Sequence, residues 1–272
     1  YGAPTGAVYA IDAFTGSIKW RKESVSINCT PVCVRDNIVY YGGAGDYIHA
    51  VTADTGAPVW TSTNNPSASH YTPLVLSSNK VILCHSSIYA FDSANGSLKW
   101  GPIGVRSGWC ESAPAVANGR IYVPRNDGGQ GVLVMDLNTG ATLWQNMGFY
   151  CTYKYGAPAV ANGKMYVVGR SVADTNAYLY CFNANASNGP LWTCYLGTTA
   201  DDVSPVVVSN VVYVGGSVVR AINANTGVEL WNFTPASNGN YDPFTKYGWM
   251  FYCDGYRLYG FSDGSPWPSS SG

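Results

Sequence analysis

Short runs in which apolar residues alternate with small or polar ones recur along the chain, and each run leads into a polar turn and a tryptophan. The first copy is VYAIDAFTGSIKW, from Val8 to Trp20. Alternation over five positions, rich in β-branched and aromatic residues, is typical of a half-buried β-strand. Asp12 can bond the backbone two residues later, and Gly16 tolerates positive φ, so the chain reverses between them. Each copy therefore predicts a β-hairpin with a bulged turn.

The hairpin phrase occurs seven times, the last time in shortened form. The six tryptophans that close the full copies are spaced 40, 40, 44, 48 and 39 residues apart. The copies are Val8–Trp20, Ile48–Trp60, Ile88–Trp100, Val132–Trp144, Leu179–Trp192, Val219–Trp231 and Leu258–Gly264.

A second repeated unit, headed by a proline, precedes each later hairpin. Proline is tolerated at the first position of a strand, and pairs such as Asn118-Gly119 then turn the chain into the next strand. The prolines are Pro31, Pro73, Pro114, Pro158, Pro205 and Pro243. Two strands from this unit and two from the hairpin make one four-stranded antiparallel blade. A period of about 40 residues built from strands predicts an all-β β-propeller.

The number of copies favours seven blades. The alternative is a ring of six blades closed by the two ends of the chain, since 250 residues separate Asp12 from Ser262 over six periods. A third interpretation pairs the incomplete ends with another molecule, because unpaired strands are templates for such pairing. We expect one propeller over residues 1–265 and a Ser/Pro-rich tail or linker start over residues 266–272.

The pattern Ala-x-Asp-x-x-Thr-Gly-x-x-x-Trp resembles the repeat of propellers of the pyrroloquinoline quinone (PQQ) type. That family includes quinoprotein dehydrogenases and non-catalytic outer-membrane assembly scaffolds. The resemblance implies that the tryptophans dock between neighbouring blades, namely Trp20, Trp60, Trp100, Trp144, Trp192 and Trp231. The dehydrogenases carry an adjacent Cys-Cys pair near the cofactor and are longer, whereas this chain of 272 residues has no such pair. The resemblance therefore indicates the non-catalytic branch, without PQQ.

Composition points to an extracellular compartment. Charged residues are only 11% and the net charge is −1, without the basic stripe that nucleic acids require. No apolar run reaches the length of a transmembrane segment. Four Asn-x-Ser/Thr sequons predict glycosylation at Asn28, Asn95, Asn185 and Asn232.

Eight cysteines, an even number, agree with an oxidising compartment. Their spacing does not fit a metal site. The candidate disulfides are Cys110–Cys151, from corresponding loops of neighbouring blades, and Cys181–Cys194, from successive strands of one blade.

The residues just before each blade-opening proline are expected to converge at one mouth of the propeller channel. Carboxylates facing one another there could act as acid and base or bind calcium, and the aromatic rings could stack on sugars. In the alternative interpretation, the polar residues are solvated or cap open strands, and the rings pack over the channel. The candidates are His70, Tyr71, Trp109, Glu111, Tyr153, Lys154, Tyr155, Asp202, Tyr241 and Asp242.

Two functions remain open from the sequence. The favoured one is a secreted, glycosylated, non-catalytic propeller that serves as a structural, adhesive or protein-interaction module and self-assembles or binds protein partners. The alternative is a carbohydrate-binding or carbohydrate-active propeller that uses the channel mouth. A PQQ-dependent dehydrogenase is the least favoured function.

Overall fold

We analysed a computed structural model of the chain. It describes residues 7–23, 31–43, 47–64, 66, 74–85, 87–104, 113–125, 131–146, 148–151, 156–174, 176–198, 203–237, 241–246, 249–262 and 265–266.

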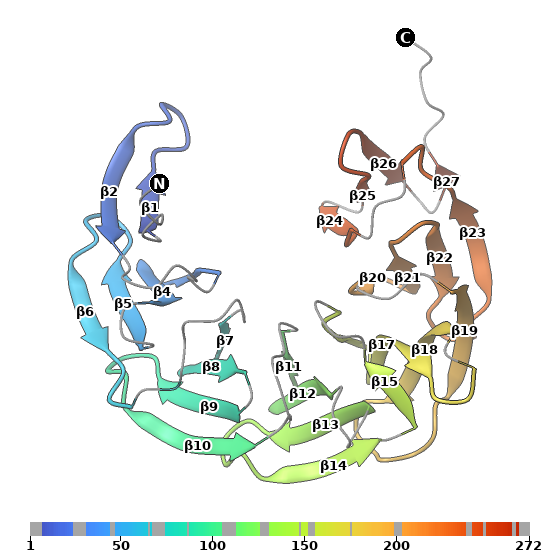
Figure 1. Cartoon of the computed structure of the whole chain (residues 1–272), viewed down its shortest axis with the longest axis horizontal. Coiled ribbons are helices and arrows are strands. Elements are labelled where there is room, and N and C mark those ends of the chain that lie inside the picture. The colour runs from blue at the N-terminus through green and yellow to red at the C-terminus, as the bar shows by residue number, and fades with distance from the viewer. Residues whose placement is uncertain are drawn as a thin grey trace. The chain divides into compact units, whose positions relative to one another are not determined.

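The described residues form 27 strands in seven antiparallel sheets and contain no helix (Figure 1). Figure 1 shows the strands of a sheet side by side in chain order, for example from β7 to β10. The chain divides into two compact units, residues 1–116 with 136–141 and residues 117–135 with 142–272.

The first three sheets contain ten strands. The first is a two-stranded sheet, and the next two have four strands each. Their bounds are β1 (Ala7–Ile11) and β2 (Ile18–Glu23); β3 (Cys33–Arg35), β4 (Ile38–Gly42), β5 (Ile48–Thr52) and β6 (Pro58–Thr61); β7 (Val75–Ser77), β8 (Lys80–Cys84), β9 (Ser87–Asp92) and β10 (Leu98–Gly104).

The other four sheets repeat the same order, with one extra strand in the fifth. There β16 and β15 both pair with β17. The bounds are β11 (Ala115–Ala117), β12 (Arg120–Arg125), β13 (Gly131–Asp136) and β14 (Thr142–Asn146); β15 (Phe149–Cys151), β16 (Ala159–Ala161), β17 (Lys164–Ser171), β18 (Ala177–Asn183) and β19 (Trp192–Gly197); β20 (Val206–Val208), β21 (Val211–Val214), β22 (Val219–Asn223) and β23 (Glu229–Phe233); β24 (Phe244–Lys246), β25 (Trp249–Cys253), β26 (Leu258–Ser262) and β27 (Ser265–Pro266).

These seven sheets confirm the prediction of seven blades over six. The seventh sheet has a fourth strand, β27, which pairs with β26 through Phe261–Pro266 and Ser262–Ser265. From the sequence we expected this repeat to end before its outer strand.

The core lies between adjacent sheets, on the two middle strands of each. Every residue of β8 is buried, and so are five of the six in β13, because both faces of these strands are covered. The outer strand β14 alternates between exposed and half-buried positions. In the first unit one cluster joins Tyr40, Ile48 and Ala50 to Leu83 and Phe91 of the following sheet.

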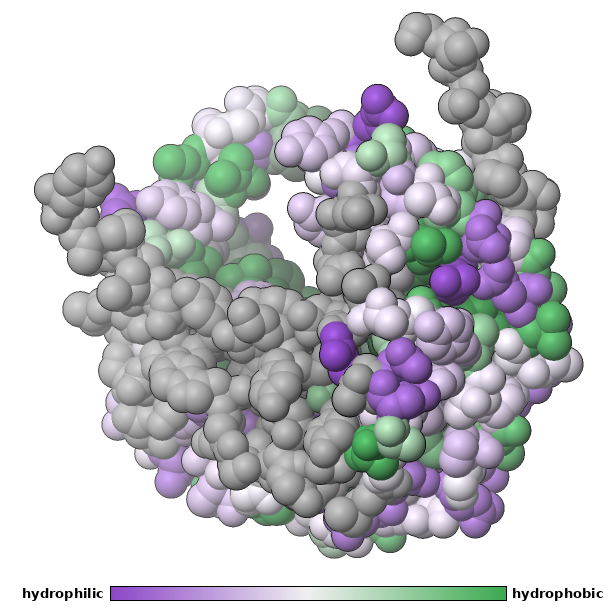
Figure 2. Space-filling view, turned by 45° about the vertical axis from the view of Figure 1, so that its right-hand side comes forward, coloured by the Kyte–Doolittle hydropathy of each residue, from purple (hydrophilic) through white to green (hydrophobic). Residues whose placement is uncertain are grey.

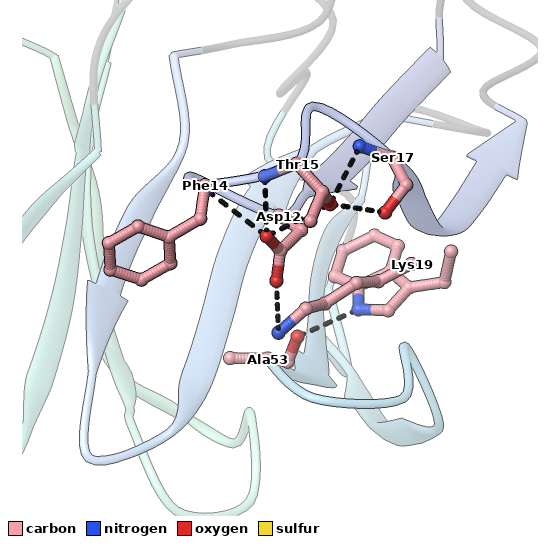
Figure 3. Close-up of polar contacts among 7 residues, drawn as sticks. Asp12, Phe14, Thr15, Ser17, Lys19 and Ala53 are labelled. Carbon is pink, nitrogen blue, oxygen red and sulfur yellow. Dashed lines mark hydrogen bonds and ion pairs between the residues drawn. The ribbon is translucent and has the colours of Figure 1, made fainter.

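The hairpin turns have the predicted Asx geometry (Figure 3). Asp12 Oδ1 accepts hydrogen bonds from the backbone N–H groups of Phe14 (3.1 Å) and Thr15 (2.9 Å). These bonds lower the pKa of the Asp12 carboxyl. The register shifts by one residue between Ala10 and Ile11, which is the expected bulge.

The tryptophan of one sheet docks on the turn glycine of the next. A Cβ added to Gly96 would lie 2.5 Å from Cε3 of Trp60, and the same close approach joins Gly56 to Trp20. The indole N–H of Trp60 also donates to Ser93 O at 3.0 Å. The turn glycine is thus required for its positive φ and for the absence of a side chain beneath the indole. The other pairs of this kind are Trp100 with Gly140 and Trp192 with Gly227.

The fifth sheet departs from this rule because its turn is one residue longer. Ser187 stands where the other turns have glycine, and its hydroxyl donates to Gln145 O at 2.9 Å, next to Trp144. The sixth sheet is a second exception, because its Trp231 stacks on Phe261 of the following sheet, with ring centroids 5.1 Å apart. Neighbouring sheets therefore contact each other in these repeats too, but through a hydroxyl–carbonyl hydrogen bond in one and an aromatic stack in the other.

A second set of contacts between sheets comes from the start of the second strand. Lys80 Nζ donates to Asn138 Oδ1 at 3.0 Å, and Arg120 and Lys164 make the same contact with Asn185 and Asn225. In the second unit, Tyr122 and Tyr166 donate their hydroxyl protons to carbonyls of the next hairpin turn, each at 3.1 Å. These cations and tyrosines were not singled out from the sequence as docking residues.

We expect Trp60→Phe to be more destabilising than Trp192→Phe, by about 1–2 kcal/mol. Both substitutions remove ring area, but only Trp60 loses a hydrogen bond, since the buried Nε1 of Trp192 has no hydrogen-bond partner among the described residues. Urea denaturation followed by circular dichroism measures both free energies of unfolding. Equal losses would show that the indole hydrogen bond contributes nothing.

Candidate functional site

Most of the predicted channel-mouth residues lie outside the described residues. This holds for His70, Tyr71, Trp109, Glu111, Tyr153, Lys154, Tyr155 and Asp202. The structure describes Tyr241 and Asp242, which precede Pro243 and β24. Convergence of the full set therefore stays a prediction.

Asp242 links the openings of two neighbouring sheets. The backbone N–H of Ser204, just before Pro205, donates to Asp242 Oδ1 at 2.5 Å. In turn, the Ser204 hydroxyl accepts a hydrogen bond from the Ala157 N–H at 3.1 Å, just before Pro158. The residues before three successive prolines thus form a chain of hydrogen bonds.

The Asp242 carboxyl has a raised pKa although the residue as a whole is exposed. Desolvation of the carboxyl raises the pKa, and the hydrogen bonds from Ser204 oppose this effect without cancelling it. The Oδ1 atom of this carboxylate accepts the Ser204 backbone N–H, which ties the group to the neighbouring sheet. This geometry agrees with the interpretation that the residue caps an open strand.

Tyr241 is exposed, and its backbone is held against the preceding sheet. A Cβ added to Gly215 would lie 2.1 Å from Tyr241 O, so only glycine permits this approach. Gly215 was missed in the sequence, although the Gly215-Gly216 pair after β21 is a signal for close backbone approach.

Other polar groups of the described chain form local pairs. Arg220 Nη1 lies 2.6 Å from Glu229 Oε2, and Glu229 Oε1 accepts from Asn232 Nδ2 at 2.5 Å. Within the described ranges, no three His, Cys, Asp or Glu side chains come together in a way that could hold a metal ion. Nor does this part of the chain contain a helix able to cross a bilayer.

The sequons differ in their surroundings. Asn95 is exposed at the tip of its turn, where its Oδ1 accepts a hydrogen bond from the Ser97 N–H at 2.9 Å. Its side-chain nitrogen, the atom that a glycan would modify, takes no part in this bond. Asn185 is exposed and accepts from Arg120 through Oδ1. Asn232 Nδ2, the atom that a glycan would modify, donates to Glu229. Asn28 lies outside the described residues.

Three of the four cysteines proposed for disulfides are described, and of these Cys181 and Cys194 are free thiols. Cys181 lies opposite Trp192 and Cys194 opposite Leu179, so the two thiols are diagonal neighbours without a bond. Burial raises the pKa of Cys181 to about 11. Cys151 is buried against Gly131 O at 3.2 Å, and Cys110 lies outside the described residues, so that pairing stays a prediction.

Repeated sheets, Asx turns and docked tryptophans define a β-propeller built from PQQ-like repeats. The sequence matches the family described as outer membrane protein assembly factor BamB over residues 2–102, 86–148 and 129–264, and the chain belongs to this PQQ-like repeat family. No curated protein matches the chain.

Solved structures support the fold. BamB from Moraxella catarrhalis is 20% identical with a TM-score of 0.69, over 96% of this chain and 78% of that one. The computationally designed Ika8 protein is 14% identical with a TM-score of 0.61, over 96% and 89%. A quinohemoprotein alcohol dehydrogenase from Pseudomonas putida is 14% identical with a TM-score of 0.57, over 75% of this chain and 41% of that one. At these identities the likeness shows the fold alone.

Proposed function

We propose that this chain is a secreted, glycosylated propeller that binds other proteins and carries out no catalysis. The family match favours this function, because the matched family is named for an assembly factor. The absence of an adjacent Cys-Cys pair from the sequence argues against a PQQ-dependent dehydrogenase.

The observation that carries the proposal is a repeated apolar position on the outer strands. The residue before the docking tryptophan is an exposed aliphatic in four repeats, namely Val59, Leu143, Leu191 and Leu230. An outer strand also presents an unpaired backbone edge, on which a partner strand can pair. Figure 2 shows hydrophobic residues interspersed with hydrophilic ones on the surface that it draws. Aliphatic side chains beside a free strand edge suit a protein partner.

The role of Asp242 also favours a function without catalysis. Its carboxylate accepts the Ser204 N–H, so this candidate contributes to the connection between sheets. One observation keeps the carbohydrate alternative open: the Tyr241 ring beside it is exposed and could stack on a sugar.

Intact mass and sedimentation of chain purified from a secreting host test the proposal. We expect excess mass in hexose units, reduced by one glycan in Asn95→Gln and unchanged in Asn232→Gln, because the Asn232 amide is engaged by Glu229. We also expect co-sedimentation with a stoichiometric protein that is lost in Leu143→Lys with Leu230→Lys. Val34→Lys, an exposed position on the inner strand β3, is the matched control.

A chain of bare sequence mass without a protein partner would contradict the proposal. Sugar binding that is lost in Tyr241→Ala, with the melting temperature unchanged, would favour the carbohydrate-binding alternative.

A further inference from the structure

The outer strand of the fifth sheet, β19, has an edge that is suited to pairing with a further strand. β19 ends the strand order of this sheet and lies on the outer side of β18 (Figure 1). Its residues, Trp192–Gly197, include neither a proline nor a charged side chain. A neutral edge of this kind is a template for a strand from another chain.

Other outer strands carry residues that hinder edge pairing. β6 begins at Pro58 and β10 contains Pro102, and proline cannot donate a backbone hydrogen bond to an added strand. β23 carries Glu229, which forms an ion pair with Arg220. The outer strand β2 carries a row of cations, namely Lys19, Arg21 and Lys22. Charged residues and prolines on an edge strand are common means by which proteins prevent such pairing.

β14 is also neutral and free of proline, but the following sheet engages its edge. Gln145 O, one residue after the docking tryptophan, accepts the Ser187 hydroxyl at 2.9 Å. The corresponding residue of β19 is Thr193. In β19 a contact from the following sheet goes to Leu196 O instead, to which Arg220 Nη2 donates at 3.3 Å. Among the described residues, no hydrogen bond from the following sheet to the Thr193 backbone is observed.

The backbone groups of Thr193 and Tyr195 face this outer edge. The Leu191 N–H donates to Cys181 O at 2.7 Å, so Cys181 directs its backbone groups at β19. Trp192 lies opposite Cys181 and therefore directs its own groups at β18. Since successive residues of a strand alternate in this direction, Thr193 and Tyr195 direct their N–H and C=O groups outward. Each of them offers a donor and an acceptor to an added strand.

Exposed apolar side chains lie along the same strand. Leu191 is 53% exposed and Tyr195 is 54% exposed. The Tyr195 ring meets the ring of Tyr178 edge to face, with centroids 5.5 Å apart. An added strand gains affinity from main-chain hydrogen bonds and specificity from contacts of its alternate side chains. Leu191 and the tyrosine pair supply apolar surface for such contacts.

The Asp174 carboxylate adds a negative charge at the end of this edge. Its Oδ1 accepts the Asn176 N–H at 3.0 Å and its Oδ2 accepts the Tyr178 hydroxyl at 2.8 Å. These hydrogen bonds lower the pKa of the exposed Asp174 carboxyl, so it is ionised at neutral pH. Tyr178 lies opposite Tyr195, which places the charge near the end of β19. A cationic side chain of a partner is complementary to it.

We propose that β19 binds an extended segment of a partner protein, which adds an antiparallel strand to the fifth sheet. The segment alternates apolar with polar side chains and carries a lysine or arginine at its start, because the start of an antiparallel strand lies beside the end of β19. Leu143 and Leu230, exposed on the outer strands of the two flanking sheets, contact other parts of the partner. The inference rests on the proposed protein-binding function and names the place and the mode of binding.

Titration with a synthetic peptide tests the strand addition. The probe begins with lysine, alternates valine with threonine and carries a fluorophore at its other end, so that anisotropy reports binding. We expect Thr193→Pro to weaken binding by about tenfold, because it removes an outward N–H but no hydrogen bond to β18. Thr61→Pro, at the corresponding position of β6, is the matched control and should leave binding unchanged. Thermal unfolding of both variants checks that they fold.

Two further measurements locate the peptide. Asp174→Asn should weaken binding of the lysine peptide by about threefold and should not affect a peptide with glutamine in place of lysine. Hydrogen exchange in the wild-type chain should show protection of the Thr193 and Tyr195 amides when the peptide is bound.

The outcomes separate this inference from the proposed function. Failure of the peptide to bind, or equal binding by Thr193→Pro and the wild type, would overturn strand addition at β19. Self-association of the chain that Thr193→Pro abolishes would assign the edge to a second copy and would overturn the proposed partner. In these cases, co-sedimentation with a different protein would leave the proposed function standing, whereas a chain that binds no protein would remove both.

Discussion

Gly96→Ala is expected to destabilise the protein by about 2–5 kcal/mol. Gly96 has a φ of 71°, and forcing a side chain into this conformation costs about 1–2 kcal/mol. The new Cβ would also lie 2.5 Å from Cε3 and 2.9 Å from Cδ2 of Trp60. Overpacking of a buried contact adds about 1–3 kcal/mol, because the indole must move away from Ser93 O and from the adjacent sheet.

Gly16→Ala is the matched control, because it has the same turn and a φ of 70° with no atom within 4 Å of the added Cβ. It should show only the backbone contribution of about 1–2 kcal/mol. Chemical denaturation gives both values, and hydrogen exchange of the β1–β2 amides checks that the control reports on its own hairpin. A shift of tryptophan emission in Gly96→Ala alone would confirm that the indole moves. Equal losses in the two variants would contradict the docking role of the turn glycine.

The hairpins could be predicted from the sequence because their signals are local. The alternation of Val8–Ile11, the Asx residue Asp12 and the glycine at position 16 lie within nine residues of one another. The second role of the turn glycine could not be predicted in this way, since the atom that excludes its side chain belongs to a tryptophan about 36 residues earlier. The fifth repeat shows the same limit: its longer turn is visible, but the compensating bond from Ser187 to Gln145 O is not.

The candidate site was harder to predict than the fold. Asp242 and Tyr241 were identified as residues before a blade-opening proline, and the structure places them just before β24. Whether a carboxylate there is free or bonded depends on the neighbouring sheet, and the Ser204 N–H that it accepts lies 38 residues away. Docking by Lys80, Arg120 and Lys164 was likewise missed, because a cation after a turn usually indicates only a solvated surface. These residues do recur at the first position of the second strand, so an alignment of the repeats would have identified them.

The free energy of unfolding should fall between about pH 10 and 12, because two buried tyrosines resist ionisation in the folded state. Burial raises the pKa of Tyr166 and of Tyr180 to about 12 each. Both side chains are buried; Tyr166 donates to Ala224 O, and Tyr180 stacks on Phe149 at 4.5 Å.

The direction of the effect follows from the proton balance. An unfolded tyrosine ionises near pH 10, so between pH 10 and 12 the unfolded chain binds fewer protons than the folded one and stability falls as pH rises. The full contribution is present below pH 10, and each tyrosine loses at most about 2.7 kcal/mol of it by pH 12. Tyr166→Phe should lose about 1 kcal/mol at pH 7, where the hydrogen bond disappears, and should have a shallower decline in the alkaline range. Urea denaturation at a series of pH values, with phenolate absorbance recorded in parallel, measures both. A smaller phenolate absorbance at pH 10 in folded Tyr166→Phe than in the folded wild type, or equal alkaline slopes for the two proteins, would show that the buried hydroxyl does not resist ionisation.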